Sequence, residues 1–328
     1  IIGELQNEGL VYCIKGSGTF VSPPRASRLE TAFDKTRKLH WAVIIPDASY
    51  GIHPKAFRGI ESFTREHNVD FVVCCTYDDV DNEYEHIQRE ISVGVDGLII
   101  VPAISTAESI RNYNYITRTG TPFVFWQRGV DYMLDVPQLL LNGYYGGYIA
   151  TKHLLDKGYT RISYLAPKRF RSSMDRYMGY CAALSEAHID VDPNLSQIGI
   201  PEGEGCALAK RMLTSDNAPD AFVCYVDSLA AEVVQAIQDV SLRISDDVGV
   251  IGFEGVLTWM DAMLQFGMTY VDINSFESGY TAAEALWALM TEQHPDIQTR
   301  VFMPTLCVRN TCLGKSSAVV SSECSASA

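Results

Sequence analysis

The chain alternates short apolar runs with longer stretches in which apolar residues recur every three or four positions. The apolar runs are four to six residues long and rich in Val and Ile, which is typical of strands buried on both faces of a parallel sheet. Such strands are predicted at residues 41–45, 71–74, 97–101, 123–126, 162–165, 221–224 and 248–251.

The stretches between these strands predict helices, because their apolar residues share one face. Helices are predicted around 57–63, 84–91 and 149–156, and at 174–187, 228–239 and 276–290. Strand–helix alternation repeated this often predicts an α/β fold of two doubly wound parallel-sheet lobes, since one sheet would hold too many strands. Ligands of such sheets bind beyond the carboxyl ends of the strands, so we expect a cleft between the lobes.

Breaks in this pattern predict the domain boundaries. Residues 39–314 form the two-lobed domain, with lobe 1 at about 39–137 and 272–293 and lobe 2 at about 138–270 and 295–314. The chain is expected to cross between the lobes near Pro137, near 270–272 and near Pro295. Residues 25–38 form a linker after two prolines, and residues 315–328, mostly Ser and Ala, form a disordered tail.

Composition narrows the class of protein. The 328 residues are 47% apolar and 20% charged, as in globular proteins, and 26 basic against 40 acidic residues give a net charge of −14. This balance excludes a protein coated in basic surface, so any contact with nucleic acid must be local. No apolar run approaches the ~18 residues of a membrane span. Nine cysteines without a Cys-x-x-Cys pair predict reduced thiols in a cytoplasmic protein.

The first residues have a different character from the rest. Residues 1–40 carry six basic and four acidic groups, whereas the remainder carries 20 basic and 36 acidic ones. Strands at 11–14 and 19–21 flank a turn, Lys15-Gly16-Ser17-Gly18, and predict a β-hairpin. Such a hairpin is either a surface ribbon or a wing that lays backbone amides and a lysine on phosphates.

Signals for an enzyme are weak. Gly314-Lys315-Ser316 resembles the end of a phosphate-binding loop, but Arg309 stands where the first glycine is required. The histidines have no ligand spacing to a cysteine or to one another. We therefore predict no catalytic residues, no metal site, no cofactor and no enzymatic activity.

The loops that follow the strands mix hydroxyls, carboxylates, guanidinium groups and aromatic rings. These groups suit a small polyhydroxylated ligand, because forked charged groups bind vicinal hydroxyls and rings cover the C–H face. Solvated loops would have a similar composition. The predicted ligand-binding residues are Asp47, Ser49, Tyr50, Trp126, Arg128, Phe170, Arg176, Asp227 and Glu254.

Residues 1–24 resemble the end of a GntR-type winged helix-turn-helix. Glu8-Gly9-Leu10-Val11 matches the end of the recognition helix, and residues 15–21 match the wing. The resemblance implies that the earlier helices are missing and that DNA contacts come from Lys15, Gly16, Ser17, Gly18 and Thr19.

Residues 39–308 resemble the LacI/GalR repressors and the periplasmic sugar-binding proteins. The matching segments, in order, are 45–47, 57–60, 95–99, 153–159, 176–180, 219–222 and 244–253. The family's Arg-x-x-Gly-Tyr motif, whose arginine grips sugar hydroxyls, is present with Arg176. Gly143, Val226, Ile273 and Glu254 depart from the family pattern and imply an altered pocket.

A GntR-like head on a LacI-like body resembles the arabinose-repressor type of regulator. The resemblance implies a cytoplasmic, homodimeric transcription factor that binds operator DNA and a small effector, a sugar or a related metabolite, with no membrane partner. Closure of the lobes on the effector would change the spacing of the paired heads. The alternative is a transport-type sugar-binding protein without a role on DNA.

Overall fold

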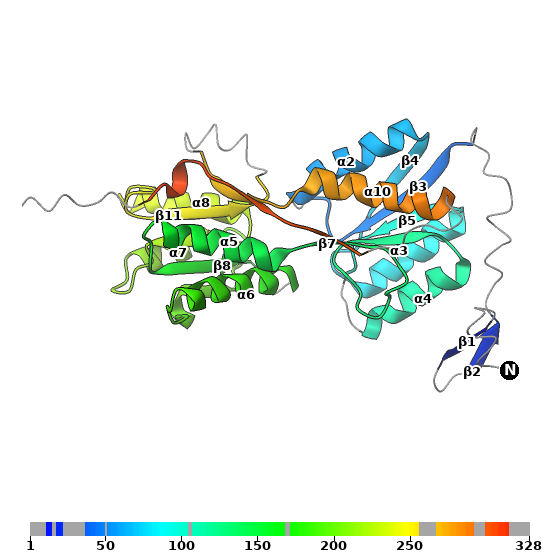
Figure 1. Cartoon of the computed structure of the whole chain (residues 1–328), viewed down its shortest axis with the longest axis horizontal. Coiled ribbons are helices and arrows are strands. Elements are labelled where there is room, and N and C mark those ends of the chain that lie inside the picture. The colour runs from blue at the N-terminus through cyan, green and yellow to red at the C-terminus, as the bar shows by residue number, and fades with distance from the viewer. Residues whose placement is uncertain are drawn as a thin grey trace, which may run out of the picture. The chain divides into compact units, whose positions relative to one another are not determined.

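The protein is described by a computed structural model, which describes residues 11–14, 18–21, 37–49, 51–103, 107–167, 171–255, 267–291 and 299–314. The chain divides into two compact units. Unit 1 comprises residues 1–141 and 275–302, and unit 2 comprises residues 142–274 and 303–328. Each unit is built around its own six-stranded sheet (Figure 1).

In unit 1 the sheet is parallel throughout, with the strand order β13-β7-β6-β5-β3-β4. Its strands are β3 (Leu39–Ile45), β4 (Val69–Cys75), β5 (Gly97–Ile100), β6 (Phe123–Gln127), β7 (Gln138–Leu141) and β13 (Arg300–Phe302). Its helices are α2 (Ile52–Glu66), α3 (Val80–Val93), η1 (Ala107–Ser109), α4 (Ile110–Thr119) and α10 (Ser275–Thr291).

Strand β3, which pairs with β4 and β5, shows why its sequence is apolar from Trp41 to Ile45. Trp41 and Val43 belong to the core beneath α2 and α10, whereas Ala42 and Ile44 belong to the core beneath α3 and α4. Successive side chains of a strand point to opposite faces, so a strand covered by helices on both sides must be apolar throughout. This confirms the predicted doubly wound arrangement.

Unit 2 has the strand order β14-β12-β11-β10-β8-β9. Its strands are β8 (Ile162–Ala166), β9 (Ser196–Ile198), β10 (Ala221–Cys224), β11 (Gly249–Phe253), β12 (Thr269–Asp272) and β14 (Thr305–Cys307). Its helices are α5 (Gly143–Asp156), α6 (Arg171–Glu186), η2 (Pro193–Leu195), α7 (Gly205–Leu213), α8 (Asp227–Asp239) and η3 (Asn310–Cys312). The edge strand β14 runs antiparallel to β12, which the expectation of purely parallel sheets missed.

The unit boundaries differ from the predicted crossing points. The sequence predicts that the two segments of lobe 1 end at about residues 137 and 293, but β7 and β13 follow these points and pair with each other in the sheet of unit 1. Proline lacks an amide hydrogen, yet it does not prevent a strand from starting at the next residue. The chain therefore leaves unit 1 only where β7 and β13 end.

Glycines allow one pair of helices in each unit to cross at very short range. In unit 2, a Cβ atom on Gly147 of α5 would lie 1.9 Å from the carbonyl oxygen of Arg176 in α6. A Cβ atom on Gly179 of α6 would lie 1.9 Å from the carbonyl oxygen of Tyr144 in α5. In unit 1, Gly59 of α2 and Gly279 of α10 form an equivalent crossing.

The predicted hairpin is present, whereas the segments around it are not described. Strands β1 (Val11–Ile14) and β2 (Gly18–Val21) pair in antiparallel register. The turn residues Lys15, Gly16 and Ser17, most of the predicted linker and the predicted tail lie outside the described residues.

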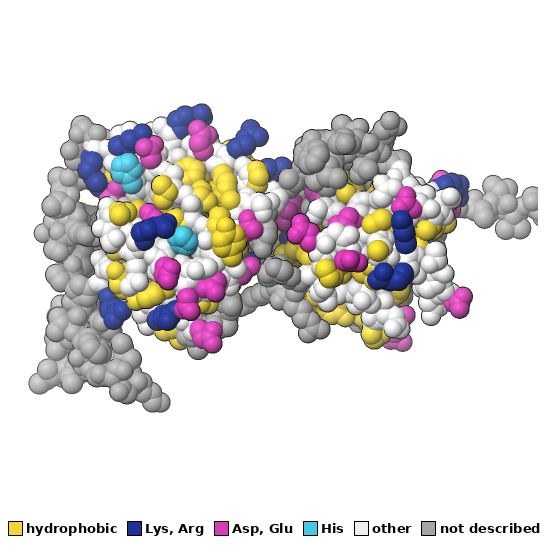
Figure 2. All heavy atoms as spheres, turned by 180° about the vertical axis from the view of Figure 1, so that it is seen from behind, with side chains coloured by type: hydrophobic (Ala, Val, Ile, Leu, Met, Phe, Trp, Pro, Cys, Tyr) yellow, Lys and Arg dark blue, Asp and Glu magenta, His cyan; other side chains and the backbone are white. Residues whose placement is uncertain are grey.

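The visible surface fits the acidic composition. On the face in Figure 2, the Lys and Arg side chains of both units are scattered among acidic and apolar ones rather than gathered into one continuous area. Across the described ranges, no helix is long and apolar enough to cross a membrane.

Candidate functional site

The carboxyl ends of the strands of unit 2 bring several predicted side chains to one edge of its sheet. Arg176 lies in the second turn of α6, which follows β8. Asp227 begins α8 just after β10, and Glu254 follows β11 directly. Since β8, β10 and β11 are parallel neighbours, their carboxyl ends lie at the same edge.

The guanidinium group of Arg176 is held between two aromatic rings. Its central carbon lies 4.3 Å from the ring centroid of Tyr225 and 4.2 Å from that of Phe253. One terminal nitrogen donates to the carbonyl oxygen of Tyr225. The Tyr225 hydroxyl is in turn hydrogen-bonded to Ser172 Oγ at 2.8 Å, which fixes the ring. Contact with two aromatic rings and with the Tyr225 carbonyl oxygen stabilises the cation and restricts its orientation.

Arg176 keeps hydrogen-bonding capacity although it is buried. The residue is only 4% exposed, and its Nε finds no acceptor among the described residues. A buried charged group normally has its donors satisfied, so an unused donor here indicates an acceptor supplied from outside the described chain. This is the clearest sign of a ligand in unit 2.

Two carboxylates lie at the same edge. Asp227 is 4% exposed, and a Cβ atom on Gly252 of β11 would lie 2.4 Å from its Oδ1, so the aspartate rests against that strand. Glu254 is 7% exposed and has a φ of +88°, a strained value for a residue with a side chain.

In unit 1, Asp47 and Ser49 lie after β3. Asp47 Oδ1 accepts hydrogen bonds from the Ser49 amide at 2.8 Å and from Ser49 Oγ at 2.7 Å. The Asp47 carbonyl oxygen lies 2.6 Å from His53 Nδ1, and because a carbonyl only accepts, this nitrogen carries the proton. His53 is 1% exposed and stacks on Phe57. The buried imidazole thus anchors the turn that presents Asp47.

Acidification is expected to destabilise the protein through His53. Burial lowers its pKa from 6.5 to about 4. Between these values the unfolded chain binds more protons than the folded protein. The free energy of unfolding therefore decreases as the pH is lowered, by up to roughly 3 kcal/mol over the whole interval. Urea unfolding of wild type and His53→Gln at about pH 7 and pH 5 measures this.

The exposed His40 supplies the control for this measurement, because its ring is not buried in the core. His40→Gln should keep the wild-type pH dependence, and His53→Gln should show a smaller loss between the two pH values. If His53→Gln loses as much free energy of unfolding as wild type, His53 is not the group responsible.

Two predicted ligand residues of unit 1, Trp126 and Arg128, contact other parts of that unit. Trp126 is fully buried, belongs to the core of unit 1 and donates its indole N–H to Ser278 Oγ at 3.3 Å. Arg128 donates to Asp78 Oδ1 at 2.6 Å and to the carbonyl oxygens of Pro102 and Ala103 at 3.0 and 3.1 Å. These contacts show what Trp126 and one terminal nitrogen of Arg128 touch in the structure, and the part of both residues in ligand binding stays a prediction.

Tyr50 and Phe170, both predicted to contact the ligand, lie outside the described residues, as do Lys15, Gly16 and Ser17. Gly18 and Thr19 lie in β2, of which only the backbone is described. Sequence reasoning missed the partners Tyr225, Phe253 and His53. A signal was available for two of them, since Tyr225 and Phe253 each stand at the end of a buried strand just before a predicted acidic residue.

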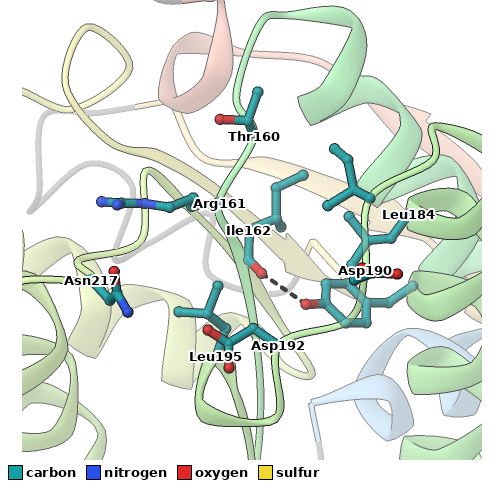
Figure 3. A pocket seen from close by; sticks show the side chains of 10 residues that line it. Thr160, Arg161, Ile162, Leu184, Asp190, Asp192, Leu195 and Asn217 are labelled. Carbon is teal, nitrogen blue, oxygen red and sulfur yellow. Dashed lines mark hydrogen bonds between the residues drawn. The ribbon is translucent and has the colours of Figure 1, made fainter.

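A small crevice of about 130 Å³ lies at the opposite, amino edge of the unit 2 sheet (Figure 3). It is bounded by the first residue of β8, Ile162, whose carbonyl oxygen accepts a hydrogen bond from the Tyr180 hydroxyl at 2.8 Å. Its other lining residues are Thr160, Arg161, Leu184, Ile189, Asp190, Asp192, Leu195 and Asn217. None of the predicted site residues lines it. In the described part of the chain, no cluster of His, Cys, Asp or Glu could hold a metal ion.

Comparison with known proteins agrees with this architecture. Residues 151–312 match the family described as periplasmic binding protein-like domain. The arabinose metabolism transcriptional repressor of Geobacillus stearothermophilus is 28% identical over 316 residues, which cover 94% of this chain and 85% of that protein. The HTH-type transcriptional repressor PurR of Aliivibrio salmonicida is 25% identical over 253 residues, 74% of each chain.

Solved structures show the same fold. The transcription regulator GntR from Chromobacterium violaceum has a TM-score of 0.76 at 22% identity, with 84% of this chain and 100% of that chain covered. A LacI family transcriptional regulator from Enterococcus faecium with bound ribose has a TM-score of 0.71 at 21% identity, with 83% and 98% covered. The named relatives are transcriptional regulators rather than enzymes. The chain is therefore similar over most of its length to transcriptional repressors, and its residues 151–312 match the periplasmic binding protein-like domain family.

Proposed function

We propose that the protein is a transcriptional regulator whose affinity for operator DNA is controlled by a small effector bound at the carboxyl edge of unit 2. The observation that carries this proposal is the buried Arg176, stacked between Tyr225 and Phe253 with Nε unused. A guanidinium held by these contacts is preorganised for an acceptor from a ligand.

The effector is proposed to be a sugar or a related polyhydroxylated metabolite. A hydroxyl both donates and accepts hydrogen bonds, and the edge offers the donor Arg176 beside the acceptors Asp227 and Glu254. Two relatives are named as repressors of arabinose metabolism and of a ribose operon. Asp47 and Ser49 of unit 1, with Tyr50 and Phe170, remain predicted contacts.

The head is proposed to be the wing of a GntR-type winged helix over residues 1–24, followed by a linker over 25–38. The match to the Geobacillus repressor supports a shared head, because a match over 94% of 328 residues cannot fit within residues 39–328. Lys15 to Thr19 would lay a cation and backbone amides on phosphates. The regulator would act as a cytoplasmic homodimer. The transport-type alternative has less support, since it gives the hairpin of β1 and β2 no role.

A panel of small molecules on the purified chain tests the proposal. We expect arabinose, ribose or another neutral polyol to raise the melting temperature, and a ligand at 100 times its dissociation constant to add about 2.7 kcal/mol to the free energy of unfolding. Succinate, which has no hydroxyl groups, serves as the negative control. If no polyol shifts the melting temperature at millimolar concentration while succinate or another acid does, the proposed effector class is wrong.

A further inference from the structure

The loop that follows β5 in unit 1 is held at the carboxyl edge of its sheet. Val101 still belongs to the ladder, since its amide donates to the Ile44 carbonyl oxygen at 2.8 Å. Pro102 and Ala103 come next and leave the sheet. Loops at this edge of a parallel sheet are the ones that contact ligands, so what fixes this loop matters for binding.

Glu83 of α3 contacts this loop through the amide of Ala103. It lies in the first turns of α3, whose start is fixed by Asp79 Oδ1 accepting from two amides at 2.8 Å. The Glu83 side chain is fully buried, and its Oε2 accepts a hydrogen bond from the Ala103 amide at 2.7 Å. Its Oε1 accepts from Asn112 Nδ2 of α4 at 2.9 Å. One carboxyl group thus joins α3, α4 and the loop.

Arg128 holds the same loop through its carbonyl oxygens. Its terminal nitrogen donates to Pro102 O and Ala103 O, and Asp78 Oδ1 accepts from that nitrogen at 2.6 Å. The amide of Ala103 is therefore bound by a carboxyl group while the neighbouring carbonyls are bound by a guanidinium. Hydrogen bonds to charged groups are roughly twice as strong as neutral ones. Glu83 and Arg128 together therefore hold Pro102 and Ala103 in one conformation.

We propose that Glu83 and Arg128 form a clamp that sets the conformation of the loop after β5 and thereby positions it for the effector. The inference rests on the proposed function, because the loop acts on binding only if the carboxyl edge of unit 1 meets the effector. Glu83 is a positioning residue, since it is fully buried and reaches the loop through the Ala103 amide.

The clamp has a defined dependence on pH. Burial, the largest cause, raises the pKa of Glu83, while Asn112, Ala103, Tyr113 and Arg128 oppose the rise. Burial is the largest cause that raises the pKa of Tyr113 and of Tyr132, and the Glu83 charge raises both further. An open loop would solvate the carboxyl and return its pKa towards 4.5, so the closed clamp binds the proton more tightly than the open one. Loop opening should therefore become easier as pH rises from 4.5 through the raised pKa.

Hydrogen exchange of peptides covering residues 101–103, without any ligand, tests the clamp directly. In Glu83→Ala we expect exchange about 10- to 100-fold faster than in wild type, because a hydrogen bond to a charged group is lost. In wild type, the protection of the Ala103 amide, corrected for the intrinsic exchange rate, should fall as pH rises from 4.5 through the raised pKa of Glu83. Glu83→Gln keeps one acceptor oxygen and should give an intermediate protection that does not change with pH.

The matched control is Glu85→Gln, an exposed carboxylate on the same helix, which should leave exchange and pH dependence unchanged. Unchanged exchange in Glu83→Ala, or wild-type protection that rises with pH, would overturn the clamp. If Glu83→Ala does not fold, the pH dependence of hydrogen exchange in wild type still tests whether Glu83 holds the loop.

Calorimetric titration with the panel compound that gives the largest thermal shift tests the positioning. Glu83→Ala should bind it about tenfold more weakly, and Glu85→Gln should bind it as wild type does. Faster hydrogen exchange with unchanged affinity would show that the loop does not contribute to effector binding, and it would overturn the proposal that the clamp positions the loop for the effector. If no compound binds wild type, the proposed function has failed, and the ligand-free exchange still judges the clamp by itself.

Discussion

Replacing Gly147 by alanine is expected to destabilise unit 2 by about 3 kcal/mol or more, at the upper end of the usual cost of overpacking. The new Cβ atom would lie 1.9 Å from the carbonyl oxygen and 2.7 Å from the carbonyl carbon of Arg176. These are backbone atoms, so no side-chain rotation relieves the clash, and α5 and α6 must move apart. Urea unfolding of the ligand-free protein measures the loss.

Gly143→Ala is the matched control, because Gly143 opens the same helix and its new Cβ atom would lie no closer than 3.3 Å to its nearest neighbour, Asp175 Cβ. That variant should change the free energy of unfolding by less than about 1 kcal/mol. Gly147→Ala also displaces the backbone of Arg176, so effector affinity should fall together with stability. A Gly147→Ala protein as stable as the Gly143→Ala protein would show that the helices do not cross at this distance.

The sheets could be predicted from sequence because their main strands are covered on both faces. An uninterrupted apolar run such as that of β3 is explained only by burial of alternate residues in two cores, as Trp41 and Ala42 show. The long amphipathic helices α2, α3 and α8 carried a second local signal, their apolar stripe. The comparisons confirm the resulting α/β fold with two parallel-sheet lobes.

The short elements carried no such local signal. Strands β7 and β13 pair with each other although they are far apart in the sequence, and β14 pairs with β12. These short strands are stabilised by that pairing rather than by a pattern in their own residues. Helix α4 has a narrow buried face with Tyr113 and Ile116 three positions apart, but the helix is short and mostly polar, and it also buries an asparagine, Asn112, against Glu83. A buried polar contact between distant residues leaves no periodic pattern in either segment.

Composition gave the site its residue types but not their partners. Arg128 and Arg176 look alike in sequence, since each follows a strand beside an aromatic residue or a turn. The structure separates them, because three acceptors surround the terminal nitrogen of Arg128 whereas aromatic rings flank Arg176. Which groups surround each arginine depends on packing between segments that are distant in sequence, so the sequence alone does not predict it.

Removing the guanidinium of Arg176 is expected to weaken effector binding about 10- to 100-fold, the cost of losing a charged hydrogen-bond donor of roughly 1.5–3 kcal/mol. Arg176→Ala removes the charge and the stacking between Tyr225 and Phe253. Arg176→Lys keeps the charge but replaces a planar fork by a point charge that stacks poorly, so it should recover only part of the affinity. Titration calorimetry with the strongest panel compound measures both variants.

Arg211→Ala is the matched control, since Arg211 is exposed on α7 and distant in sequence from the strand ends of the site. It should bind the effector as wild type does. The ligand-free melting temperature of each variant separates binding from folding, because stacking also stabilises unit 2. If Arg176→Ala melts earlier without ligand yet shows the full ligand-induced shift, the arginine only holds α6 against β10 and β11. The effector then binds elsewhere, and the unused Nε has no part in recognition.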